Sequence, residues 1–100
     1  MYKYIEIKGA LKDKKTIKSY PKATQSKLLY LVNDILYDPR NLNTIGHPEQ
    51  LKHTKKEMWS RELTKKDRIV YGIEQGSIYN MPEENEVVVF YQYLEHYLDK

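Results

Sequence analysis

The fold of this chain is decided by the stretch Glu57-Met-Trp-Ser-Arg-Glu-Leu-Thr-Lys-Lys-Asp-Arg-Ile-Val-Tyr-Gly-Ile-Glu74. Apolar and polar side chains alternate over residues 57–64 and again over residues 67–74, which is the pattern of strands with one buried face. The residues between the two runs are polar and typical of a tight turn. The two runs are therefore predicted to pair as an antiparallel hairpin.

Two helices are predicted before this hairpin. Residues 9–19 are lysine-rich and predict a short helix with a narrow apolar stripe. The apolar residues that this helix can bury are Ala10, Leu11 and Ile17. A longer helix is predicted over residues 21–37, where Leu, Ile and Val recur at helical spacing until Asp38-Pro39 ends it. Residues 40–54 contain Asn, Gly and Pro and are predicted to be a loop.

Strands are also predicted near both ends of the chain, at residues 2–8 and 86–94, and the second is apolar enough to be central in a sheet. The order βααβββ predicts one α+β domain over residues 1–100. In it the two helices pack on one face of a mainly antiparallel sheet. The opposite face is expected to be open and to carry the chemistry.

The composition excludes several classes of protein. The 100 residues include no cysteine, which excludes disulfides, a thiolate nucleophile and a cysteine-ligated zinc. No apolar run is long enough to span a membrane, and the first residues lack the basic-then-apolar order of a secretory signal. We therefore expect a soluble cytoplasmic domain that makes no contact with membranes.

Charge is distributed unevenly along the chain. Residues 1–68 hold 16 of the 17 Lys and Arg against eight acids, a net charge of +8, whereas residues 69–100 have a net charge of −5. A basic surface suits a polyanion such as RNA. A solvated lysine-rich surface would have the same composition, so charge alone leaves both interpretations open.

Side chains suited to metal-free RNA cleavage are present. Such cleavage needs a base for the 2′-hydroxyl, a cation for the phosphate and an acid for the leaving oxygen. The candidates are Glu49, Lys52, Arg61, Arg68, His96 and Tyr97. No metal-ligand spacing, glycine-rich phosphate loop or serine-hydrolase motif accompanies them. Composition alone would equally describe scattered surface charges.

The order and spacing of these residues resemble a known family. The stretches that carry the resemblance are Gly46-His-Pro-Glu-Gln-Leu-Lys-His53, Trp59-Ser-Arg-Glu-Leu-Thr-Lys-Lys-Asp-Arg-Ile-Val-Tyr71 and the pair His96-Tyr97. They resemble the Txe/YoeB toxins of the RelE superfamily of toxin–antitoxin modules. The likeness is detailed over residues 46–73 and resumes at residues 92–97.

The resemblance implies a RelE-like fold of the small microbial-ribonuclease type. It also implies a ribosome-dependent endoribonuclease that cuts messenger RNA in the decoding site and inhibits translation, by acid–base transesterification without metal or cofactor. The matched catalytic positions are Glu49 as general base, Arg68 as the phosphate-stabilising cation, His96 as general acid and Tyr97 as an orienting residue. Lys52 and Arg61 match positions that line the same cleft and contact RNA.

Partners are implied in the same way. An antitoxin of the YefM or Axe type is expected, with an acidic disordered segment that folds on binding. The ribosome and messenger RNA follow from the implied activity, and the complex with the antitoxin is expected to reach operator DNA. Whether the free protein forms a homodimer stays open.

Three features depart from the family pattern. Glu62 stands where the family usually has a cation, and on a strand it would face away from Arg61. This leaves two positions open for Glu62: outside the cleft, or lining the cleft, where it would repel RNA. Residues 76–86 lengthen the last hairpin and add acids, and residues 98–100 extend beyond the His-Tyr pair. These departures favour an alternative, a catalytically weak or inactive homologue that binds antitoxin or ribosome. A free-standing nucleic-acid-binding domain is a further alternative, without a recognition helix to support it.

Overall fold

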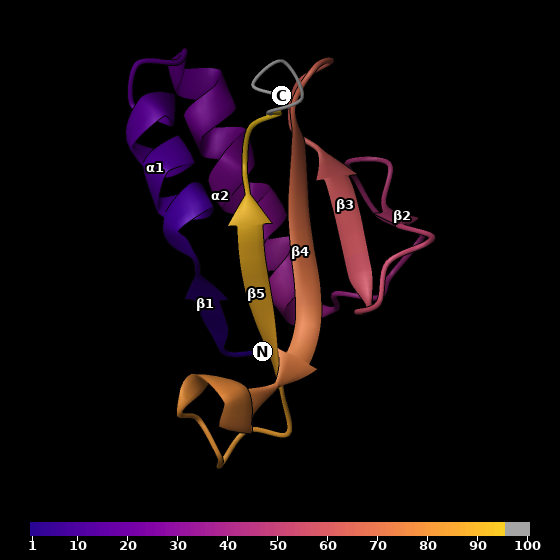
Figure 1. Cartoon of the computed structure of the whole chain (residues 1–100). Coiled ribbons are helices and arrows are strands. Elements are labelled where there is room, and N and C mark those ends of the chain that lie inside the picture. The colour runs from indigo at the N-terminus through magenta and orange to yellow at the C-terminus, as the bar shows by residue number, and fades with distance from the viewer. Residues whose placement is uncertain (96–100) are drawn as a thin grey trace.

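The structure is a computed structural model, and it describes residues 1–95. The elements in chain order are β1 (Tyr4–Glu6), α1 (Lys8–Ile17), α2 (Lys22–Tyr37), β2 (Glu49–Gln50), β3 (Met58–Glu62), β4 (Arg68–Gln75), the short 3₁₀ helix η1 (Gly76–Tyr79) and β5 (Glu86–Gln92). Both helices pack on one face of a five-stranded sheet (Figure 1). This arrangement confirms the predicted α+β class.

The sheet has the strand order β1-β5-β4-β3-β2. β1 runs parallel to β5, and the other three pairings are antiparallel, so the prediction of a mainly antiparallel sheet is confirmed. The predicted hairpin is β3–β4, with Trp59 opposite Tyr71. β5 lies between β1 and β4, which confirms its predicted interior position.

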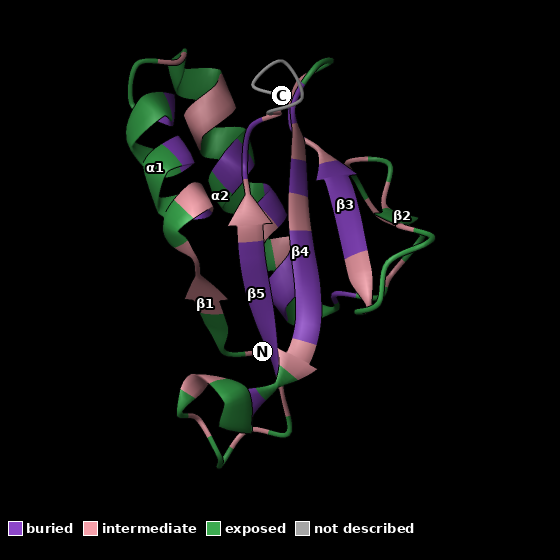
Figure 2. Ribbon diagram, viewed as in Figure 1, coloured by how far each residue is buried: buried purple, intermediate pink, exposed green. Residues whose placement is uncertain are grey.

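Alternation along the strands separates the core from the open face. The core between sheet and helices includes Leu28, Leu31, Ile35 and Leu36 of α2 together with Trp59, Leu63, Ile69, Tyr71, Ile73, Val88 and Phe90. Figure 2 shows the buried residues concentrated along β3, β4 and β5. Burial of this apolar surface is the main force that holds the helices on the sheet.

The two helices lie close to their predicted ranges. α2 begins directly after Pro21, which suits the start of a helix. In α1 the expectation that Leu11 is buried is wrong, because Leu11 is 48% exposed while Asp13 is only 2% exposed. Residues 10, 13 and 17 share one helical face, and this is the face that meets the sheet. Within residues 1–95, no helix has the length and apolar content needed to cross a membrane.

The predicted loop over residues 40–54 contains a short strand. In β2, Glu49 lies opposite Ser60 and Gln50 lies opposite Trp59. The Leu51 N–H then donates to the Met58 carbonyl at 2.9 Å. Two residues cannot show alternation, so this strand exists through its pairing with β3 rather than through a pattern of its own.

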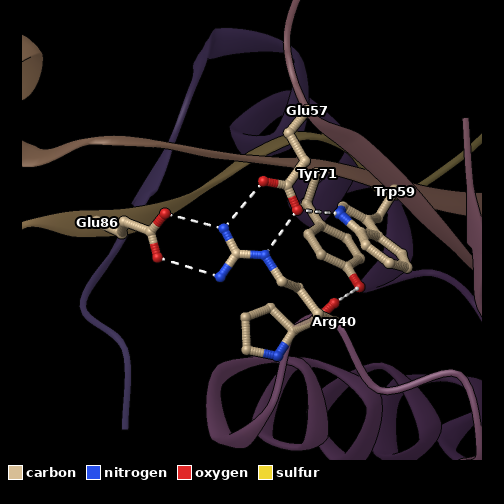
Figure 3. A network of polar contacts seen from close by, with 6 residues as sticks. Arg40, Glu57, Trp59, Tyr71 and Glu86 are labelled. Atoms are coloured by element: carbon tan, nitrogen blue, oxygen red, sulfur yellow. Dashed lines mark hydrogen bonds and ion pairs between the residues drawn. The ribbon is translucent and has the colours of Figure 1, made fainter.

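Arg40 connects three parts of the chain. Its guanidinium bonds the carboxylates of Glu57, just before β3, and Glu86, the first residue of β5, at 2.8–3.1 Å (Figure 3). The Trp59 Nε1 also donates to Glu57 at 2.8 Å. The hydrogen bonds from Arg40 lower the pKa of Glu57 and of Glu86, although burial opposes this effect. Arg40 therefore fixes the end of the sheet at which β3 and β5 begin.

The long connection between β4 and β5 lies at that same end of the sheet. η1 follows directly after Gln75, the last residue of β4, whereas Arg68 is the first residue of that strand (Figure 1). Eight residues of strand span about 25 Å. The acidic side chains of residues 83 and 84 are therefore carried to the opposite end of the sheet from Arg68.

Candidate functional site

The open face of the sheet brings one carboxylate and one arginine to the same side. Glu49, Ser60 and Val70 lie directly opposite one another on β2, β3 and β4. Opposed residues point to the same face of a sheet, and Arg68 shares that face because it lies two residues before Val70. Since neighbouring strands are about 4.8 Å apart, β2 and β4 are separated by about 10 Å.

Arg68 is held in place by two acceptors. Its Nε donates to the Ser60 hydroxyl at 3.0 Å, and its second terminal nitrogen donates to the His47 carbonyl at 2.8 Å. The Arg68 side chain is 29% exposed. Ser60 of β3 and the His47 carbonyl of the loop before β2 thus fix the orientation of Arg68, while part of its side chain still meets solvent. A guanidinium fixed in this way is suited to bind a phosphate.

The loop before β2 is shaped to supply one of these acceptors. Gly46 has φ 84° and His47 has φ 46°, both in the left-handed region. A Cβ on Gly46 would lie 2.9 Å from Leu31 Cδ2, so the loop passes directly against α2. The Glu62 N–H donates to the Gly46 carbonyl at 2.6 Å. This contact ties the turn to β3 and presents the His47 carbonyl to Arg68.

Glu62 lies on the open face beside Arg68. The two residues are opposite each other in the β3–β4 pairing, and a terminal nitrogen of Arg68 is 4.0 Å from Glu62 Oε1. Of the two positions left open for Glu62, the structure shows the one beside Arg68, and Glu62 faces away from Arg61 as predicted. A partly exposed carboxylate next to Arg68 reduces the positive charge that the site offers to a phosphate.

Arg61 does not join Arg68 on the open face. It is 0% exposed, lies on the helix-covered side of β3 and donates to the Asp34 carboxylate of α2. Burial acts to raise the pKa of Asp34, but hydrogen bonds from Arg61 and Thr44 lower it below its usual value. Within residues 1–95, Arg61 Nε and one terminal nitrogen have no hydrogen-bond acceptor. The expected placement of Arg61 in the cleft is not what the structure shows, because the side chain has no exposed surface.

Lys52 lies near Glu49 at the edge of the sheet. Both residues line a shallow hollow of about 590 Å³, together with Gln50, Leu51 and Thr54. Lys52 is exposed and belongs to the connection between β2 and β3. The structure thus brings Lys52 to Glu49, and it joins Glu49 to Arg68 through Ser60 on the strand between them.

The sites predicted at His96 and Tyr97 lie outside the described residues. The last residues that are described approach Arg68, since Gln92 Nε2 donates to the Arg68 carbonyl at 3.2 Å. The Glu95 N–H donates to Asp67 at 3.0 Å. Over residues 1–95, no group of three or more His, Asp or Glu side chains could hold a metal ion.

Sequence reasoning missed the two groups that hold Arg68. Ser60 is 1% exposed and stands between Trp59 and Arg61 in the sequence. Strand alternation alone puts Ser60 on the face opposite to both neighbours, and therefore on the face of Arg68. The His47 carbonyl had no such signal, because a backbone conformation with positive φ at a histidine is not encoded by residue type.

These groups can perform simple chemistry together. The Arg68 guanidinium, held in one orientation, can bind the oxygens of a phosphate. The exposed Glu49 carboxylate, two strands away, can accept a proton from a hydroxyl of the molecule that carries this phosphate.

The uncovered face and the helix-backed sheet are those of the RelE-like fold, the fold of a class of small bacterial toxins. The chain belongs to the family of YoeB-like toxins of bacterial type II toxin–antitoxin systems, whose model matches residues 7–97.

Known relatives agree with this assignment. The chain is similar to Toxin YoeB of Escherichia coli O6:H1, with 33% identity over 61 residues that cover 59% of this chain and 73% of the relative. Among solved structures, the YoeB dimer from Staphylococcus aureus is similar with a TM-score of 0.73 and 22% identity, covering 96% of this chain and 98% of that one. The heterotetrameric YoeB-YefM toxin-antitoxin complex from Staphylococcus aureus is similar with a TM-score of 0.72 and 23% identity, covering 97% of this chain and 99% of that one. These two structures support the fold.

Proposed function

We propose that this toxin is an endoribonuclease that cuts messenger RNA in the decoding site of the ribosome and so inhibits translation. The observation that carries the proposal is the partly exposed Arg68 guanidinium, which Ser60 and His47 hold on the same sheet face as Glu49. A fixed cation and a carboxylate on one sheet face are the two groups that RNA transesterification needs for its phosphate and for its first proton transfer.

The reaction is a transesterification within the RNA. The Glu49 carboxylate takes the proton of a 2′-hydroxyl, and the freed oxygen attacks the adjacent phosphorus. Arg68 stabilises the negative charge that builds on the non-bridging oxygens. The bond from phosphorus to the 5′-oxygen breaks and leaves a 2′,3′-cyclic phosphate. Lys52, next to Glu49, binds the neighbouring phosphate of the same strand.

The 5′-oxygen needs a proton as it departs, and we assign this step to His96. Histidine changes charge near neutral pH, so it can carry that proton under cellular conditions. Tyr97 orients the histidine or the RNA. Arg61 has no place among these groups, and its role is to hold β3 against α2 from the helix-covered side.

The ribosome supplies what the small site lacks. The described groups can position one phosphate, but they cannot align three nucleotides, and alignment accounts for much of the rate enhancement in such reactions. An acidic antitoxin of the YefM type is the expected partner, and the heterotetrameric YoeB-YefM toxin-antitoxin complex from Staphylococcus aureus supports this expectation. The complex with the antitoxin is expected to bind operator DNA. A homodimer is expected in the free state, and the YoeB dimer from Staphylococcus aureus supports this expectation.

One observation favours a second function. Glu62 Oε1 is 4.0 Å from a terminal nitrogen of Arg68 and offsets part of its charge. A site weakened in this way would suit a homologue that binds antitoxin or ribosome without cutting RNA.

Single-turnover cleavage of messenger RNA on programmed ribosomes tests the proposal. Glu49→Ala and Arg68→Ala are each expected to slow cleavage by roughly a hundredfold or more. Glu83→Ala and Lys27→Ala remove the same charges from exposed positions outside the site and serve as matched controls, with no effect expected. Wild-type protein that binds ribosomes but leaves RNA uncut would favour the second function. Unchanged cleavage by both Ala variants at positions 49 and 68 would overturn the proposed mechanism.

A further inference from the structure

Tyr91 of β5 lies in a second hollow on the open face of the sheet. Its hydroxyl donates to the carboxylate of Glu74 on β4, and Glu74 shares the face of Arg68 because alternate residues of a strand point the same way. The hollow that contains Tyr91, here the Tyr91 hollow, has a volume of about 240 Å³ and is lined by Thr54, Lys55, Lys56, Met58 and Tyr91. The proposed reaction uses none of these residues.

A β-bulge directs the Tyr91 side chain. In the pairing of β4 with β5, Val70 lies opposite Gln92 while Tyr71 lies opposite Phe90, so Tyr91 is an extra residue in β5. Such a bulge changes the direction of a side chain and is frequent beside active sites.

Glu74 holds the hydroxyl end of the Tyr91 ring. Its carboxylate accepts hydrogen bonds from the Tyr91 hydroxyl and, at 2.8 Å, from the hydroxyl of Tyr79 in η1. The Lys56 ammonium donates to the Tyr91 hydroxyl at 3.2 Å and lies 3.5 Å from Glu74 Oε1. Burial and the hydrogen bond to Glu74 raise the pKa of Tyr91, so the hydroxyl keeps its proton at neutral pH. These contacts fix the position of a flat aromatic surface.

The Lys56 ammonium lies toward the hydroxyl end of this ring. It is 3.2 Å from the hydroxyl oxygen but 5.6 Å from the ring centre. Met58 adds apolar surface to the hollow and lies opposite Gly72 on β4. A Cβ on Gly72 would lie 3.2 Å from Met58 Sδ and 3.1 Å from a carboxylate oxygen of Glu74. The glycine therefore leaves the space that these two side chains occupy.

Cations accompany the aromatic ring. Lys55 is exposed, and the side chain of Lys56 is 59% exposed. Sites for single-stranded nucleic acid combine aromatic rings, on which bases stack, with cations that contact the backbone. The Tyr91 hollow also adjoins the hollow of Glu49 and Lys52, because Thr54 lines both. An RNA strand at Glu49 can consequently continue to Tyr91.

We propose that the Tyr91 hollow binds an unpaired base of the RNA by stacking, next to the nucleotide whose phosphate lies at Arg68. This inference rests on the proposed function and names a further part of the substrate. Gly72, opposite Met58, is four residues from Arg68 along β4, about 13 Å. The stacked base therefore belongs to a neighbouring nucleotide. Stacking accepts any base, so the hollow requires the presence of a base rather than a particular sequence.

The test combines variants of Tyr91 with messages that lack one base. Single-turnover cleavage on programmed ribosomes is measured for an intact message and for messages with one abasic residue beside the two nucleotides that the cut separates. For wild type, loss of one of these bases should lower kcat/KM roughly tenfold, as expected when one stacked base is removed. Tyr91→Leu should lower cleavage of the intact message by a similar factor and lose nothing more on that abasic message, because both changes remove the same contact.

Two variants serve as controls. Tyr91→Phe keeps the ring and should keep both the rate and the dependence on the base to within about threefold. Tyr30→Leu removes the same side chain from a 60% exposed position on α2 and should match wild type on every message. If Tyr91→Leu does not fold, Tyr91→Met fills the space with a flexible side chain that has no flat ring and takes its place.

The outcomes are distinct. Wild-type protein that cuts none of the messages overturns the proposed function, and the base site with it. Wild-type protein that cuts the intact and abasic messages equally well overturns the base site and leaves the proposed function intact. A dependence on the base that persists in Tyr91→Leu would overturn the assignment to Tyr91. Loss of that dependence in Tyr91→Leu, with its retention in Tyr91→Phe and Tyr30→Leu, supports the proposal.

Discussion

The guanidinium of Arg61 on β3 donates a hydrogen bond to the carboxylate of Asp34 on α2, on the helix-covered side of the sheet. Arg68, on the adjacent strand, has its guanidinium on the open side and bonds Ser60 and the His47 carbonyl there. Two arginines of one hairpin thus have opposite surroundings. The buried one joins helix to sheet, and the accessible one faces solvent.

Removing the buried arginine should therefore affect stability. Arg61→Ala is expected to lower the free energy of unfolding by about 3 kcal/mol, because it leaves the Asp34 carboxylate without its cation. Urea unfolding measures the change. The matched variant replaces both partners, Asp34→Leu with Arg61→Met, and should be as stable as wild type to within about 1 kcal/mol and cut RNA normally. A stable double variant that no longer cuts RNA would instead give Arg61 a direct role in the reaction.

Ser60 should matter for the reaction more than for the fold. Ser60→Ala removes the acceptor of Arg68 Nε, and loss of a hydrogen bond to a charged group costs about 1.5–3 kcal/mol. We expect kcat on programmed ribosomes to fall roughly tenfold or more, since 1.4 kcal/mol corresponds to a factor of ten. Ser60→Thr keeps the hydroxyl and should retain most of the activity. Equal losses in both variants would point to packing around Ser60 rather than to its hydroxyl.

Glu62 should restrain the proposed cleavage of RNA. Glu62→Gln removes the negative charge 4.0 Å from Arg68, and exposed ion pairs are worth about 0.2–1 kcal/mol. We therefore expect kcat/KM to rise roughly two- to fivefold at low salt, and the gain to shrink as salt is added. Glu83→Gln, at the other end of the sheet, is the control for overall charge. A loss of activity in Glu62→Gln would mean that this carboxylate assists the reaction.

The Arg40 network should make folding sensitive to acid. Hydrogen bonds from Arg40 lower the pKa of Glu57 and of Glu86, with burial opposing. The folded state therefore binds fewer protons than the unfolded state, and the stabilisation present above the ordinary glutamate pKa is lost as pH falls through the lowered values. Between pH 7 and about pH 3, unfolding free energy should drop more in wild type than in Arg40→Gln. Lys65→Gln, an exposed cation, should follow the wild-type curve, and parallel curves for Arg40→Gln would contradict this account.

The end of the chain can be tested by truncation. Deleting residues 96–100 should reduce cleavage on programmed ribosomes far more than deleting residues 98–100, because only the longer deletion removes the proposed proton donor. His96→Gln should resemble the longer deletion. Equal activity in all three proteins would show that the donor lies elsewhere.

Much of the fold followed from residue periodicity. The alternation of Trp59, Arg61 and Leu63 with polar neighbours predicted β3, and the same alternation puts Arg61 on the core side with the two apolar residues. The resemblance to the toxin family had suggested the cleft for Arg61. For this position the periodicity was the better guide, because a side chain between two core residues on a strand must share their face.

Other features depend on partners far away in the sequence. β2 is defined by its pairing with β3, and the burial of Asp13 depends on backbone groups 80 residues later. The sequence of this lysine-rich helix predicts an exposed Asp13. Its burial follows only from the backbone N–H groups of Tyr93 and Leu94, which donate to its carboxylate. Local patterns carry no information about such contacts.

The parallel pairing of β1 with β5 has a consequence for how the protein is made. Tyr4, Ile5 and Glu6 find their strand partners only at Val88, Val89 and Phe90. A nascent chain therefore cannot complete the sheet until nearly all of it has been synthesised, since loop closure over more than 80 residues must precede this pairing. The five-stranded sheet is therefore completed only after β5 has been synthesised, and until then β1 has no strand partner.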